Sequence, residues 1–205
     1  MKTRNLFIIT IFAFSFSGCL ILSFYPFYTE KDLFENDILT GKWIDEDSLV
    51  WNFTHPVIKT NNSETINKKT YNLNLTDYDF KNTSYNVNLF KLDNTIFIDF
   101  YIEKIENQTS APSKSDVTWW SLHLLPVHTI AKLNIEGDTL KISWFDIAWL
   151  EDQLKEKKIK IRHEKNGENI LLTAKTKDLQ KMISKYAELE EAFKDGVKLK
   201  LVRSE

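Results

Sequence analysis

The side chains best suited to chemistry are scattered along this 205-residue chain. Its four histidines occur singly, at His55, His123, His128 and His163. The five-residue spacing of His123 and His128 does not put two metal ligands on one face of a strand. We interpret each histidine as a solvated or hydrogen-bonded structural residue. The chain also lacks the motifs of serine hydrolases, zinc proteases and phosphate-binding loops, so no catalytic residue, metal site or cofactor is predicted.

Carboxylates provide two further candidate binding sites. Asp45, Glu46 and Asp47 could hold a cation, but the run lacks the glycine of a calcium loop and lies between two predicted strands, which favours a charged turn. Asp99 stands in an otherwise apolar run. If it faced the interior it would need a partner, as polar groups in binding sites do. The alternation of neighbouring isoleucines instead favours an outward Asp99 in contact with water.

Trp119 and Trp120 lie in a long polar segment, residues 103–126, that interrupts the strand pattern. Loops of this length are usually functional or mobile. The two side chains either cover the mouth of a binding site, face a partner, or pack against the sheet. We keep Trp119, Trp120 and Asp99 as candidate ligand-binding residues.

Residues 2–19 carry two positive charges, an apolar run and small residues before the only cysteine, which is the pattern of an export signal. The run Phe16-Ser17-Gly18-Cys19 resembles the lipobox of bacterial lipoproteins. The resemblance implies a signal peptide over residues 1–18 and a diacylglycerol on Cys19, with acyl chains such as palmitate holding the protein on a membrane. It implies a location in the bacterial cell envelope, and the outer membrane is favoured.

Apolar residues continue to Tyr25, so an uncleaved signal-anchor helix over residues 6–25 stays open as an alternative. Because Lys2 and Arg4 would stay on the cytoplasmic side, both interpretations place everything after residue 28 outside the cytoplasm.

The composition, 42% hydrophobic and 27% charged, is that of one globular domain. The net charge of −2 gives no reason to expect nucleic acid or a polybasic hold on lipid as a partner. With a single cysteine the chain forms no intramolecular disulfide, so the exported domain depends on its own core. We expect a tether over residues 19–40 and a domain over residues 41–205.

Within residues 41–205, short runs of period two predict strands. They cover residues 41–45, 48–54, 69–76, 84–92, 95–102, 127–136, 139–145, 158–163, 169–174 and 197–203. Turn residues at Asp93 and Gly137 predict hairpins. Successive hairpins form an antiparallel meander, and closure into a barrel removes its exposed edges. The predicted fold is therefore mainly β, with two short helices capped by Asp146 and Thr176.

Gly41-Lys42-Trp43, at the first predicted barrel strand, resembles the Gly-x-Trp signature of lipocalins and lipocalin-like proteins. The resemblance implies an eight-stranded barrel with Trp43 closing one end, and a helix followed by a last strand at the end of the chain.

These observations favour a non-catalytic binding module that takes a small apolar molecule. The alternatives are an interaction or structural subunit of an envelope complex, and a hydrolase with dispersed catalytic residues. If large side chains meet across the barrel interior they fill it, and if they line it a ligand can enter.

Overall fold

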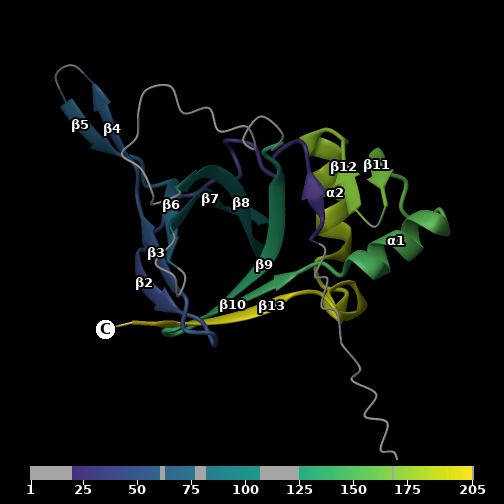
Figure 1. The fold of residues 1–205 in the computed structure, drawn as a ribbon. Coiled ribbons are helices and arrows are strands. Elements are labelled where there is room, and N and C mark those ends of the chain that lie inside the picture. The colour runs from purple at the N-terminus through teal and green to yellow at the C-terminus, as the bar shows by residue number, and fades with distance from the viewer. Residues whose placement is uncertain (1–19, 61–62, 77–81, 107–124, 168, 205) are drawn as a thin grey trace, which may run out of the picture.

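The computed structural model describes residues 20–60, 63–76, 82–106, 125–167 and 169–204. Its main feature is a closed barrel of eight antiparallel strands, which confirms the predicted lipocalin-like, mainly β fold (Figure 1). The barrel strands, in their order around the wall, are β2 (Gly41–Ile44), β3 (Val50–Thr54), β6 (Thr70–Thr76), β7 (Asn82–Leu92), β8 (Thr95–Glu106), β9 (His128–Glu136), β10 (Thr139–Trp144) and β13 (Lys198–Arg203). The last strand, β13, pairs with β2 and closes the ring.

Other strands lie outside the barrel. β4 (Val57–Thr60) and β5 (Ser63–Ile66), which are not among the strands that the sequence predicts, form a hairpin that projects away from it (Figure 1). β1 (Leu22–Ser23) pairs with the start of β9 and, in parallel, with β12 (Asn169–Leu172), which pairs with β11 (His163–Asn166).

The strand predicted over residues 158–163 is also wrong, because residues 158–162 fold back onto the end of the preceding helix. The backbone N–H groups of Lys158 and Ile159 both donate to the carbonyl oxygen of Gln153, at 2.9 and 3.1 Å. Hydrogen bonds that would pair a strand are thus used to end the helix.

The two helices are present, and their caps differ from each other. α1 (Ile147–Lys155) begins at Asp146, whose carboxylate accepts hydrogen bonds from the N–H groups of Ala148 and Trp149, which confirms the predicted cap. The predicted cap of α2 (Thr176–Tyr186) is wrong. Lys175 is its N-cap residue, and the Thr176 hydroxyl donates to the carbonyl oxygen of Pro26 at 2.8 Å. A 3-10 helix, Glu190–Phe193, follows α2.

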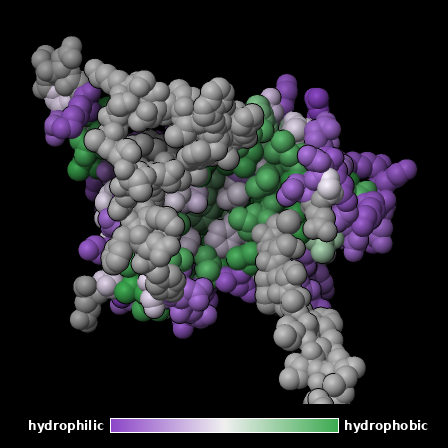
Figure 2. Space-filling model, in the orientation of Figure 1, coloured by the Kyte–Doolittle hydropathy of each residue, from purple (hydrophilic) through white to green (hydrophobic). Residues whose placement is uncertain are grey.

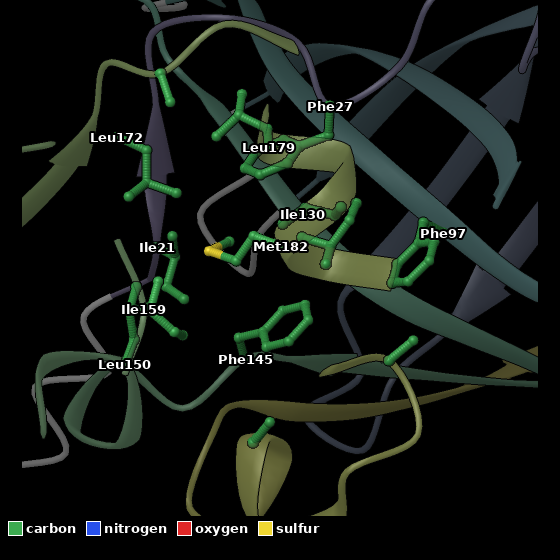
Figure 3. Close-up of a cluster of buried hydrophobic side chains, with 14 of the residues drawn as sticks. Ile21, Phe27, Phe97, Ile130, Phe145, Leu150, Ile159, Leu172, Leu179 and Met182 are labelled. Carbon is green, nitrogen blue, oxygen red and sulfur yellow. The ribbon is translucent and has the colours of Figure 1, made fainter. Parts of the chain in front are cut away.

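Buried side chains form two clusters, one inside the barrel and one outside it. In the outer cluster, Phe97 and Ile130 from the barrel wall face Leu179 and Met182 of α2 (Figure 3). The wall formed by β7, β8 and β9 is therefore buried on both faces, which explains why its outward positions include large apolar residues.

Gly41 and Trp43 lie where the barrel closes. Trp43 is fully buried, its indole Nε1 donates to the carbonyl oxygen of Leu39 at 2.7 Å, and the Arg203 guanidinium lies 4.2 Å from the ring centre. Gly41 has a φ of +116°, which an L side chain rarely adopts, and an added Cβ would lie 3.1 Å from the Arg203 guanidinium. Trp43 thus joins the first barrel strand to the last.

Residues 20–40, where the sequence predicts a tether, lie against the rest of the fold. Four apolar side chains from this segment are buried, those of Ile21, Phe27, Leu33 and Leu39. Phe27 and Ile21 belong to the outer cluster, and Leu39 belongs to the barrel interior. Packing therefore begins within a few residues of Cys19.

Candidate functional site

The sequence predicts a small apolar ligand in the barrel interior. Inside it, Trp51 of β3 packs edge-on against Phe100 of β8, with ring centres 6.3 Å apart, and Phe100 stacks on Trp144 of β10 at 5.6 Å. β6 and β7 separate β3 from β8 in the wall, so the first contact crosses the interior. Each of the three side chains is only 6% exposed. At this level the protein's own aromatic residues fill the barrel.

One of these aromatic residues has an unused donor. Trp144 Nε1 is buried and has no hydrogen-bond partner among the described residues. The equivalent atom of Trp51 donates to the Asp45 carboxylate at 2.9 Å. A buried donor left without an acceptor costs ~1–3 kcal/mol. An acceptor group of a ligand would therefore be stabilised beside Trp144.

Asp99 faces outward from the barrel, as the alternation of its strand predicts, but it is not in contact with water. It is 0% exposed because the outer layer covers this part of the wall. One carboxylate oxygen lies 2.8 Å from His128 Nδ1, and the His128 ring packs on Tyr101 with centres 4.6 Å apart. Asp99 and His128 thus form a buried pair on the outer wall, which the sequence spacing could not indicate because β8 and β9 are far apart in the chain.

In the part of the chain that the structure describes, the second oxygen of Asp99, Oδ1, has no hydrogen-bond partner. Neither does Asn88 Oδ1, which belongs to the directly opposite residue of β7. Burial raises the pKa of the Asp99 carboxyl, and the hydrogen bond and charge of His128 partly oppose this shift. Burial also raises the pKa of Tyr28, and the Asp99 charge adds to that shift. This is a tightly packed polar cluster and not an open site.

The other predicted candidates have structural roles or lie elsewhere. Asp45 organises a turn, where its carboxylate accepts hydrogen bonds from the N–H groups of Asp47 and Leu49. His55 bridges the Thr70 carbonyl oxygen and the Asp37 carboxylate. Within the described ranges, no three His, Cys, Asp or Glu side chains are arranged to hold a metal ion. Cys19, Trp119, Trp120 and His123 lie outside the described residues.

A groove of about 440 Å³, which the sequence does not predict, lies beside α2. Its walls are α2, residues 158–162 and residues 173–175. The backbone N–H of Thr173 donates to the carbonyl oxygen of Arg162 at 3.0 Å and ties two of these walls together. The floor is apolar, with Ile159, Ala174 and Met182 each less than 10% exposed. The volume is typical of sites for small molecules, ~300–1,000 Å³.

The rim of this groove is strongly basic. Six cationic residues and one carboxylate residue, Asp178, line it, although the whole chain has a net charge of −2. The cationic residues are Lys158, Lys160, Arg162, Lys175, Lys181 and Lys185. A cleft lined by one sign of charge concentrates ligands of the opposite sign.

The alternation of Lys158, Lys160 and Arg162 with two isoleucines was the sequence signal for one wall of this groove. From the sequence alone this alternation predicts a strand over residues 158–163. The second wall comes from α2, and nothing in the sequence places α2 opposite these residues.

The chain matches none of the protein families with which it was compared, and no curated protein or solved structure matches it. The fold therefore defines the class of protein, a lipocalin-like eight-stranded barrel with a second, helical layer on its outer wall. In the part of the chain that the structure describes, no helix is long and apolar enough to cross a membrane.

Proposed function

We propose that this protein is a lipid-anchored, non-catalytic interaction module of the bacterial cell envelope, in which the barrel is a rigid scaffold. The observation that carries the proposal is the contact of Trp51 with Phe100 across the interior. Side chains that meet across a small barrel occupy the space that a ligand would need. Binding is then assigned to the outer surface, and the partner is another envelope component.

The start of the fold supports anchoring through Cys19. Ser23, four residues later, is fully buried and pairs with His128, so an acylated Cys19 would lie within ~15 Å of the packed domain. Phe24 and Tyr25 remain 48% and 41% exposed. Figure 2 shows hydrophobic residues gathered over β1, beside hydrophilic residues over α1 and β11. Exposed aromatic residues next to an anchor suit the interface between membrane and water.

Metabolic labelling tests the anchor. Cells expressing the wild-type protein are grown with a fatty acid analogue, and a strain expressing Cys19→Ser is the control. We expect label on the wild-type protein only, and a mature wild-type chain that begins at Cys19. Label on the Cys19→Ser protein, or a mature chain that still begins at Met1, would replace the lipoprotein proposal with the signal anchor.

A small apolar ligand is the second candidate, because Trp144 Nε1 is buried inside the barrel and no described residue accepts its hydrogen bond. Mass spectrometry of an extract of the purified full chain tests it, together with titration of an apolar fluorescent probe that contains one carbonyl acceptor. If this candidate is correct, Trp144→Phe weakens saturable binding by about fivefold or more, the effect of one lost hydrogen bond. Trp119→Ala with Trp120→Ala tests the predicted entrance. Without a co-purifying molecule or saturable binding, the scaffold proposal stands alone.

A further inference from the structure

We propose that the groove beside α2 binds the headgroup of an anionic phospholipid, with the first part of the acyl chains on its apolar floor. The inference rests on the proposed anchoring at Cys19 only for the place where the lipid is met, which is the membrane that carries the anchor. The binding itself is a property of the groove.

The first argument is uncompensated charge. Lys158 is paired with Glu156 at 2.6 Å, and Lys181 lies 3.8 Å from Asp178. Lys160, Arg162 and Lys175 are exposed and make no ion pair with any described residue. Lys185 lies over the Tyr186 ring, 4.8 Å from its centre. Several cations around one groove are thus available to an anion, and an arginine among them suits bidentate contact with phosphate.

The second argument is an unused hydroxyl. Thr173 Oγ1 is buried, has no hydrogen-bond partner within the described ranges and belongs to a residue that lines the groove. The Thr173 backbone N–H is already used by Arg162. A change of the Thr173 side-chain rotamer would turn this hydroxyl toward the groove, where a phosphate oxygen would accept its hydrogen bond.

The third argument is the floor. Ile159, Ala174 and Met182 form an apolar base directly beneath the charged rim, and Ile161 and Tyr186 extend it. A free inorganic anion has no apolar part that could pack on this floor. A ligand with an anionic group and hydrocarbon within a few ångströms of each other uses both parts, and the flexible methionine side chain adapts to an alkyl chain.

Met182 also provides a direct reporter. The chain has two methionines, Met1 and Met182, so labelling of methionine methyl groups with ¹³C gives one signal from the groove floor. The full chain, kept soluble in a non-ionic amphipol, is titrated with dihexanoyl phosphatidylglycerol. We expect a saturable shift of the Met182 methyl signal. Dihexanoyl phosphatidylcholine, which is zwitterionic, and glycerophosphoglycerol, which lacks acyl chains, should each bind at least about tenfold more weakly.

Charge reversal supplies the matched test. Lys160→Glu with Lys175→Glu removes two unpaired cations from the rim and should weaken phosphatidylglycerol binding by at least about tenfold. Lys42→Glu with Lys200→Glu changes the net charge equally at two exposed barrel positions and should change binding by less than about twofold. An unchanged Met182 signal without ligand confirms that each variant is folded.

Equal binding of phosphatidylcholine, or equal loss of binding in both double variants, would overturn the proposal. So would equal binding of glycerophosphoglycerol, which would reduce the groove to an anion site, or tighter binding of polyglutamate, which would assign it to an acidic peptide. The labelling of Cys19 is independent of this titration, so a failure of the anchor and a failure of the groove are distinguishable.

Discussion

Asp99 is the residue at which burial has the clearest chemical consequence. Among the residues that the structure describes, neither its Oδ1 atom nor the Oδ1 atom of Asn88, the directly opposite residue of β7, has a hydrogen-bond partner. Protonation of Asp99 would turn one of these two acceptors into a donor. This agrees with the raised pKa of its buried carboxyl, which means that the folded protein holds this proton more tightly than the unfolded chain does.

The contribution of this proton to folding stability is fully present below the ordinary carboxyl pKa of ~4. It is lost as pH rises through the raised pKa of the folded protein. We therefore expect Asp99→Asn, whose amide donates at every pH, to gain stability relative to the wild type between about pH 4 and neutrality. Urea unfolding at several pH values measures the difference. The same change at the exposed residue Asp195 is the control. A difference between Asp99→Asn and wild type that stays constant with pH would contradict a shared proton.

The starts of the two helices differ in how far the local sequence determines them. α1 and α2 are both preceded by an extended residue, but only Asp146 provides a side chain that accepts the first N–H groups of its helix. At α2 the Thr176 hydroxyl donates to the carbonyl oxygen of Pro26, in the segment after β1, and so ties the start of the helix to another part of the fold. Capping by a side chain is therefore a local property in α1, and the start of α2 depends on tertiary contacts.

This difference predicts unequal effects of alanine at the two N-cap positions. Asp146→Ala should destabilise the protein by ~1 kcal/mol, within the usual range for a lost N-cap, because two helix N–H groups lose their acceptor. Lys175→Ala should change stability by less than ~0.5 kcal/mol, since Lys175 makes no side-chain cap. Chemical denaturation measures both. Equal losses would show that the Asp146 carboxylate does not stabilise α1 as a cap.

For the whole molecule, closure of the barrel depends on contacts between the two ends of the domain. Trp43 on β2, Leu39 before it and Arg203 on β13 meet where the ring closes. The outer cluster packs on the outer face of the barrel at β7, β8 and β9. The barrel and the helical layer therefore share these three strands. We expect the two clusters to unfold together.

Trp43→Ala should accordingly cost ~3–5 kcal/mol, the range for removing a large buried aromatic side chain. Phe24→Ala is a suitable control, because Phe24 is an aromatic residue that is 48% exposed, and its loss should be small. Thermal unfolding followed by both far-UV and near-UV circular dichroism gives the cost and shows whether there is one transition. A loss within ~0.5 kcal/mol for Trp43→Ala would mean that Trp43 does not hold the barrel closed.

The sequence by itself determined the eight barrel strands, the hairpins at Asp93 and Gly137 and the closure into a barrel. Period-two alternation and turn residues such as Asp93 and Gly137, both with positive φ in the structure, are local signals, so they survive without knowledge of the fold. The cap at Asp146 is local for the same reason. The outward direction of Asp99 also followed from its own strand.

Only the tertiary structure decided what covers those outward positions. Asp99 is buried because α2, β1 and their neighbours pack on the outside of the barrel, and alternation along one strand carries no information about a second layer. Trp51 and Phe100 meet across the interior because the barrel is narrow, a distance that no spacing in the chain encodes. The groove arises because residues 158–162 turn back onto α1 and lie opposite α2, so its cations converge through contacts between segments that are distant in sequence.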